Sequence, residues 1–149
     1  KGKTLCWKVG ESIVRTGPPS LYHDLYLQRK DMEWKRNLAG ENAVVATGVL
    51  ASKKIGHDTE AYQWLSGAYT VPAGTLYTGE VPKLPLCGSS GGSAPMLPPA
   101  QLHKRSKRYA VKLFLAHFWE TMYEDHYGKA PPLPYPISKL GHVHVITRP

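Results

Sequence analysis

One amphipathic stretch near the carboxyl end, HKRSKRYAVKLFLAHFWETMYEDHY (His103–Tyr127), most constrains how this chain can fold. Two prolines precede the stretch, and a glycine and two further prolines follow it, as at helix boundaries. We therefore expect one long helix over 99–128, with Phe114 and Phe118 in the core. The apolar residues recur at intervals of three and four, the period of an α-helix; they are Val111, Phe114, Leu115, Phe118 and Met122.

The charges on this expected helix are reversed relative to the helix dipole. A helix start carries partial positive charge and favours acids, whereas a helix end favours bases. Here a basic cluster stands at the start and acidic residues stand at the end. Each misplaced charge costs roughly a few tenths of a kcal/mol, which a fold tolerates. The arrangement is easier to explain if the cations bind a partner.

The basic cluster predicts contacts with phosphate groups. Lysine meets a phosphate as a point charge, and arginine can donate two hydrogen bonds to it. Tyr109 lies beside the cluster, where its ring could stack on a base or pack on a sugar. The alternative is that these cations only solvate a helix end. The predicted nucleic-acid-binding residues are Lys104, Arg105, Lys107, Arg108, Tyr109 and Lys112.

The composition of the whole chain also favours a polyanionic partner. Its 149 residues suit a single domain, 1–149, and can bury a core. Lys and Arg total 19 against 11 Asp and Glu, a formal net charge of +8. Such a basic balance is typical of proteins that bind DNA or RNA. The alternative is that the charge serves only solubility.

The two cysteines, Cys6 and Cys87, are too few for a disulfide framework. One bridge is an open alternative, but reduced thiols in a cytoplasmic protein fit this count better. No run of about 18 apolar residues is present, so we expect no membrane span. Because the chain opens at Lys1, we expect a processed chain or a segment of a longer protein.

The whole pattern predicts a mainly α fold of α+β class with about four helices. β-branched and aromatic residues around Gly10-Glu11 predict a hairpin over 4–16. Gly, Pro and Ser dominate 67–98, which we expect to be a long loop or an insertion. A proline-rich arm and a strand, Leu140–Ile146, fill 129–149. Caps and apolar periodicity predict three further helices in the part 20–66. These cover 21–38, 42–55 and 59–65.

The histidines form a second candidate site. His117 and Glu120 share a face of the long helix, and His142 and His144 share a face of the expected strand. Together they could act as the metal or acid–base site of a metal-dependent nuclease. Metal motifs of defined spacing, such as HExxH, are absent from the sequence. We therefore expect no bound metal and no other cofactor, and we assign no catalytic residue.

Two resemblances bear on function. His142-Val-His144 resembles the His-hydrophobic-His signature of single-strand nucleases that use a catalytic tyrosine, although no tyrosine follows it here. The runs LPPAQLHKRSKRYAVKLFLAHFWETMY and YGKAPPLPYPISKLGHVHVI resemble the C-terminal parts of bacterial mobile-element (transposase-type) and phage-borne proteins. This second resemblance covers about a third of the chain. It implies bacterial DNA or RNA handling, with an insertion ahead of the long helix.

Three hypotheses follow from the sequence. The first is a nucleic-acid-binding domain of a mobile-element or ribonucleoprotein assembly, without catalysis of its own. The second is a metal-dependent nuclease that uses the His/Glu set. The third is a protein–protein subunit of a larger complex. Salt-dependent binding to DNA or RNA separates the first from the third, and metal content separates the second from the first.

Overall fold

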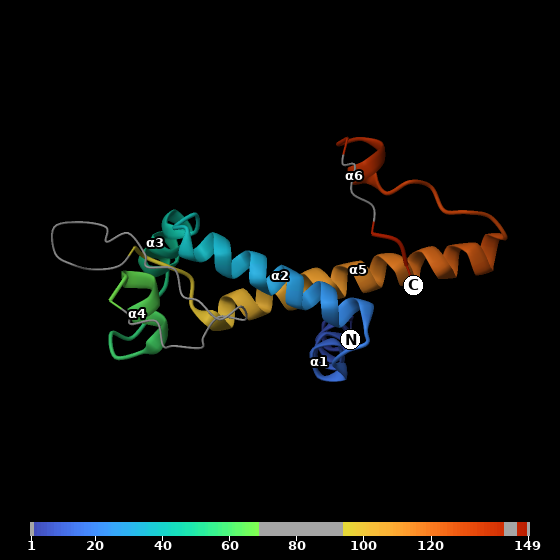
Figure 1. Ribbon diagram of the computed structural model, residues 1–149. Helices are drawn as coiled ribbons and strands as arrows, with labels where there is room; N and C mark the ends of the chain where they lie inside the picture. Colours follow the sequence, from blue (N-terminus) through green and yellow to red (C-terminus); the bar gives the residue numbers. More distant parts are fainter. Residues whose placement is uncertain (1, 69–93, 142–145, 149) are drawn as a thin grey trace. The chain divides into compact units, whose positions relative to one another are not determined.

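The computed structural model describes residues 2–68, 94–141 and 146–148, and in these ranges it contains helices and no strand (Figure 1). None of the described helices is long and apolar enough to cross a membrane. In chain order the helices are α1 (Gly2–Thr16), α2 (Leu21–Leu38), α3 (Ala43–Ser52), α4 (Glu60–Ser66), α5 (Pro99–Tyr127) and the single turn α6 (Tyr135–Ser138).

The helices expected between residues 20 and 128 lie where the sequence places them. α2 and α5 have nearly the expected bounds, and α3 and α4 begin one residue later than expected. The Thr59 hydroxyl caps α4 by accepting a hydrogen bond from the Tyr62 N–H at 3.2 Å. Gly67 ends α4 in the left-handed conformation, with φ of 81°. Local capping chemistry therefore sets these boundaries.

The predicted N-terminal hairpin is wrong, because residues 2–16 form the helix α1. Gly10 has no positive φ and makes no turn; it lets α5 approach α1 closely. A Cβ at Gly10 would lie 3.0 Å from Lys107 Cγ and 3.2 Å from Val111 Cγ2. Gly10 and Ile13 are buried and Cys6 is half-buried. The face that packs thus has the three-to-four spacing of a helix, not the alternation of a strand.

The predicted α+β class is also wrong for the described residues, since the expected C-terminal strand is not seen either. Leu140, Gly141 and Ile146 have no strand conformation. The middle of that segment, 142–145, lies outside the described residues, and so does 69–93 of the expected loop. The described end of the loop belongs to the core, because Met96 and Leu97 are fully buried.

Contacts within the chain divide it into two compact units. Unit 1 consists of Lys1–Tyr26 and Lys107–Pro149, and unit 2 consists of Leu27–Ser106. Both α2 and α5 therefore contribute residues to each unit. The single domain expected over 1–149 stays a prediction.

Unit 2 has a closed apolar core. α3 packs against α4, and the rings of Trp34 and Trp64 meet edge to face with centroids 5.9 Å apart. Val49, Leu50 and Ile55 pack against this core from the side. Such burial is the main stabilising contribution in a helical unit of this size. The core residues are Trp34, Leu38, Ala46, Trp64, Leu65, Met96, Leu97 and Leu102.

Most buried polar side chains of unit 2 are hydrogen-bonded, although Asn42 Nδ2 has no partner among the described residues. The buried amide of Asn37 donates a hydrogen bond to the Leu97 carbonyl and accepts one from the Leu97 N–H, both at 3.0 Å. The Glu33 carboxylate is 2% exposed and bonds Arg29 at 2.6 Å and Arg105 at 3.2 Å. Because buried polar groups are costly unless satisfied, these contacts fix how the chain enters α5.

Unit 1 leaves large apolar side chains outside its core. Phe114 is half-buried and packs edge-on against Tyr22, with ring centroids 5.4 Å apart. The prediction that Phe118 is a core residue is wrong, because it is 55% exposed. The apolar period of α5 simply continues past the part of the helix that α1 and α2 cover. The exposed apolar residues of this part of α5 are Leu115, Phe118, Trp119, Met122 and Tyr127.

Candidate nucleic-acid interface

All six predicted nucleic-acid-binding residues lie on α5, and the contacts of the five cations among them divide these cations into two groups. Between Pro99 and Trp119 the helix carries five Lys and Arg residues and no Asp or Glu. Lys104 and Arg105 belong to unit 2, and the other four residues belong to unit 1. What each cation contacts decides whether it is available to a partner.

Arg105 and Lys107 are held by acids of the chain itself. Arg105 donates hydrogen bonds to the Glu33 carboxylate at 3.2 Å and to the Asn42 side-chain oxygen at 3.1 Å. The Lys107 ammonium forms an ion pair with Glu11, and its stem packs on Gly10. Both cations are therefore used within the fold: Arg105 compensates a buried carboxylate, and Lys107 ties α5 to α1.

Lys104, Arg108 and Lys112 are different. Each is exposed, and none makes a hydrogen bond or an ion pair with any other residue that the structure describes. Arg108 and Lys112 are four residues apart, a spacing that places side chains on the same helix face. Tyr109 is half-buried. Arg108 and Lys112 of unit 1, with Lys104 in unit 2, remain the cations best placed to meet an anion.

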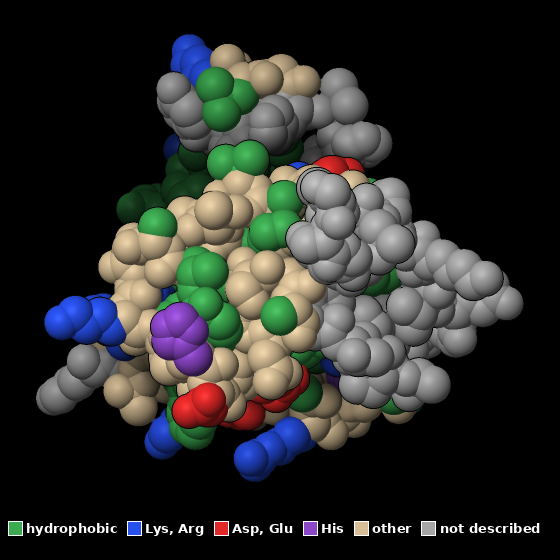
Figure 2. Space-filling view, turned by 90° about the vertical axis from the view of Figure 1, so that its left-hand side faces the viewer, with side chains coloured by type: hydrophobic (Ala, Val, Ile, Leu, Met, Phe, Trp, Pro, Cys, Tyr) green, Lys and Arg blue, Asp and Glu red, His purple; other side chains and the backbone are tan. Residues whose placement is uncertain are grey.

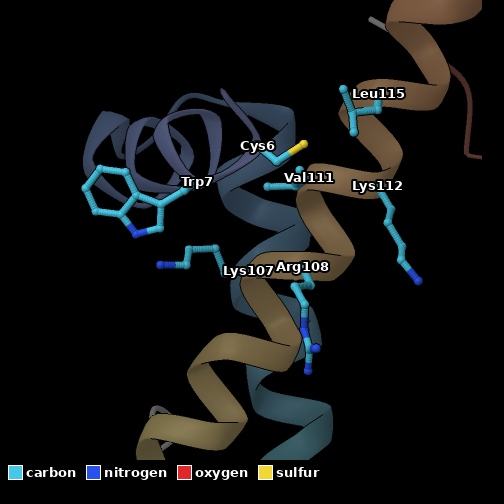
Figure 3. A pocket seen from close by; sticks show the side chains of 7 residues that line it. All are labelled: Cys6, Trp7, Lys107, Arg108, Val111, Lys112 and Leu115. Atoms are coloured by element: carbon cyan, nitrogen blue, oxygen red, sulfur yellow. The ribbon is translucent and has the colours of Figure 1, made fainter. Parts of the chain in front are cut away.

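An apolar cavity of about 370 Å³ lies next to these two cations, within unit 1 (Figure 3). α1 contributes two of its residues and α5 the rest. Figure 3 shows Lys107 extending toward the side of Trp7, while Arg108 and Lys112 extend outward from α5. The sequence could not reveal this cavity, because α1 was expected to be a hairpin. Its lining residues are Cys6, Trp7, Lys107, Arg108, Val111, Lys112 and Leu115.

A second, more open hollow of about 470 Å³ lies in unit 2, where α3 leads into α4. His57 packs on Tyr62 there with ring centroids 4.2 Å apart, and Lys53 and Lys54 border it. Figure 2 shows one face of the molecule, on which the Lys and Arg side chains project separately rather than forming one basic patch. Lys53 and Lys54 directly follow α3, where the helix dipole favours cations, so this hollow is a weaker candidate for a polyanion.

The histidine candidates are only partly described. His117 is buried, its Nε2–H donates to the Ile146 carbonyl at 2.8 Å, and its Nδ1 accepts from the Tyr22 hydroxyl at 3.0 Å. This assignment follows because a carbonyl can only accept. Both ring nitrogens are thus engaged, and Glu120 is not bonded to either of them. His142 and His144 lie outside the described residues, so their proposed role stays a prediction.

The described residues contain no group of three or more His, Cys, Asp or Glu side chains that could hold a metal ion. At the acidic end of α5, the Glu124 carboxylate is paired with a residue of the chain itself. Arg148 forms an ion pair with Glu124 and donates a hydrogen bond to the Thr121 hydroxyl at 3.3 Å. The segment 146–148 is therefore fastened to α5 by the His117 and Glu124 contacts.

Comparison of the chain with family models, with curated proteins and with solved structures finds no match.

Proposed function

We propose that this protein binds nucleic acid through phosphate contacts made by Arg108 and Lys112 of unit 1; Lys104, in unit 2, is a separate candidate contact. One observation carries the proposal. Within a helix segment that has no acid, neighbouring cations are neutralised by Glu33 and Glu11, whereas these three are not paired with any described residue. The net charge of +8 supports the same conclusion. A role within a mobile-element or ribonucleoprotein assembly is part of this proposal and rests on the sequence resemblance alone.

Phosphate is the ligand chemistry that suits such residues. Exposed Lys and Arg release counterions when they bind a nucleic acid, so affinity falls with salt in proportion to the number of phosphates neutralised. Phosphate contacts fix position but carry no sequence information. The proposal therefore predicts binding that depends steeply on salt and only weakly on base sequence.

The test compares two double variants that lose the same charge. Arg108→Ala/Lys112→Ala removes the proposed contacts, and Lys53→Ala/Lys54→Ala removes two exposed lysines of unit 2. Affinity for a labelled oligonucleotide is measured over a range of salt concentrations. The salt slope is the slope of the logarithm of the binding constant against the logarithm of the salt concentration. We expect the first variant to bind more weakly and the magnitude of its salt slope to fall by about 1.4–1.8. The second variant should stay close to wild type. Equal effects in both variants would show that only net charge matters, and no effect in either would refute the proposal.

A change of all four clustered cations to Ala would be less informative. Arg105→Ala removes a partner of the buried Glu33 carboxylate, and Lys107→Ala leaves Glu11 without the ion pair described above. Loss of binding in such a variant would mix lost contacts with lost stability. The double variant of Arg108 and Lys112 therefore tests the proposed contacts more cleanly than the change of all four cations does.

A second candidate, a subunit of a larger protein assembly, is favoured by the apolar side chains that α5 exposes. Phe118, Trp119 and Met122 are 55%, 47% and 51% exposed. Contiguous exposed apolar side chains are typical of interaction surfaces. Salt distinguishes the two candidates, because apolar docking does not weaken as salt rises, whereas phosphate binding does.

A further inference from the structure

The cavity of unit 1 combines an open aromatic wall with an apolar interior. Trp7 stands at its edge and is 59% exposed, while Cys6, Val111 and Leu115 provide the remaining apolar lining (Figure 3). Its volume of about 370 Å³ lies within the range of sites that take small organic groups. An exposed indole beside an apolar hollow suits a flat ring better than it suits water.

The charges around this cavity point to an anionic ligand. Lys107 is neutralised by Glu11, which is the only acid in α1. Arg108 and Lys112 line the cavity with their aliphatic stems, while their charged ends extend away from it (Figure 3) and have no acidic partner among the described residues. The site therefore suits a ligand whose flat, apolar part enters the cavity and whose negative charges lie outside it, at the charged ends of Arg108 and Lys112.

We propose that the cavity takes an unpaired nucleobase, which stacks on Trp7 while Arg108 and Lys112 bind the flanking phosphates, so that the protein prefers single-stranded nucleic acid. This inference rests on the proposed function and adds the strand type. In a duplex the bases are stacked and paired, and exposing one costs a few kcal/mol. A single strand offers a free base, and stacking on an aromatic side chain tolerates every base.

The first test changes the exposed tryptophan. Trp7→Ala should weaken binding to a single-stranded oligothymidylate about tenfold, the order of one lost base stack, while the salt slope stays unchanged. Trp7→Phe should retain most of the affinity because it keeps a ring. Trp119→Ala serves as the matched control, since Trp119 is also exposed and lies outside the cavity.

The Arg108→Ala/Lys112→Ala and Trp7→Ala variants together distinguish the proposed phosphate binding from the proposed base stacking. If Arg108→Ala/Lys112→Ala lowers the salt slope but Trp7→Ala has no effect, phosphate binding stands and the base-stacking inference is overturned. If Trp7→Ala and Trp119→Ala weaken binding equally, the inference is also overturned, because the effect does not belong to the cavity. Circular dichroism and the denaturation midpoint confirm that each variant is folded.

The second test measures whether a ligand occupies the cavity from the alkylation rate of the Cys6 thiol. Cys6 lines the cavity and is half-buried. In a Cys87→Ser background Cys6 is the only cysteine, so its alkylation rate can be followed by mass spectrometry. Oligothymidylate at saturating concentration should slow alkylation severalfold. An abasic oligonucleotide of the same length and a duplex, also at saturation, should slow it much less. Equal protection by the abasic strand or by the duplex would contradict the inference.

Discussion

The two units of this protein differ in where their largest side chains lie. The largest fully buried side chains all belong to unit 2, and they include the polar residues Glu33, Asn37 and Ser106. Unit 1 exposes Trp7, Phe118, Trp119 and Met122, and leaves Arg108 and Lys112 unpaired among the described residues. Unit 2 therefore buries its largest side chains and hydrogen-bonds most of its buried polar groups. Unit 1 keeps aromatic rings and cations available, which is what a binding surface needs.

The largest expected effect is the loss of a core aromatic ring from unit 2. Trp64 is 3% exposed and packs on Trp34, so Trp64→Ala should lower the free energy of unfolding by about 3–5 kcal/mol. Phe118→Ala in unit 1 should lower it by less than about 1 kcal/mol, since an exposed ring loses little burial. Chemical denaturation measures both. Equal losses would mean that the contrast between the units is false.

Asn37 tests the polar side of the same contrast. Asn37→Ala would leave the N–H and C=O of Leu97 unsatisfied in a buried place, at a cost of about 2–3 kcal/mol. Gln28→Ala on the same helix is the control, because Gln28 is exposed and its loss should be nearly neutral. The denaturation midpoints of the two variants measure these two losses of stability. An unchanged midpoint in Asn37→Ala would show that the two hydrogen bonds between Asn37 and the Leu97 backbone do not contribute to stability.

The smallest effect concerns titration of Tyr22 in unit 1. Burial, and then the nearby Glu120 carboxylate, raise the pKa of Tyr22 above its ordinary value of 10.0. The folded state therefore favours the neutral phenol; its contribution to stability is present below about pH 10 and is lost as pH rises through the raised pKa. The difference between wild-type and Tyr22→Phe ultraviolet titrations isolates this group. A pKa at the ordinary value would contradict the burial of the Tyr22 phenol.

The positions of α2 to α5 were accessible from the sequence because their signals are local, whereas the fold class was not. Apolar spacing, prolines and glycines predict α2 to α5 to within a few residues. α1 was missed because a glycine such as Gly10 can serve either in a turn or where two helices approach closely. Only the position of α5 shows that the second applies here. Phe118 was misplaced for a related reason: periodicity shows which face of a helix is apolar but not how far along the helix that face is covered.

The candidate site was predicted in outline only. The sequence shows which cations exist on α5, but not which of them a distant acid neutralises. Arg105 meets Glu33 from 72 positions away, and Lys107 meets Glu11 from 96 positions away. Trp7 and Cys6 were not assigned to the site, because α1 and α5 form its cavity together only after folding.

The central claim is that cations only three residues apart serve different purposes, Arg105 the fold and Arg108 a nucleic acid. The most direct measurement pairs Arg105→Ala with Arg108→Ala and determines for each the denaturation midpoint and the salt slope of oligonucleotide binding. Arg105→Ala should lower the midpoint and leave the slope unchanged at temperatures where it is folded. Arg108→Ala should leave the midpoint unchanged and lower the slope by about 0.7–0.9, one phosphate contact. An unchanged slope in Arg108→Ala, or the same slope change in both variants, would contradict the account.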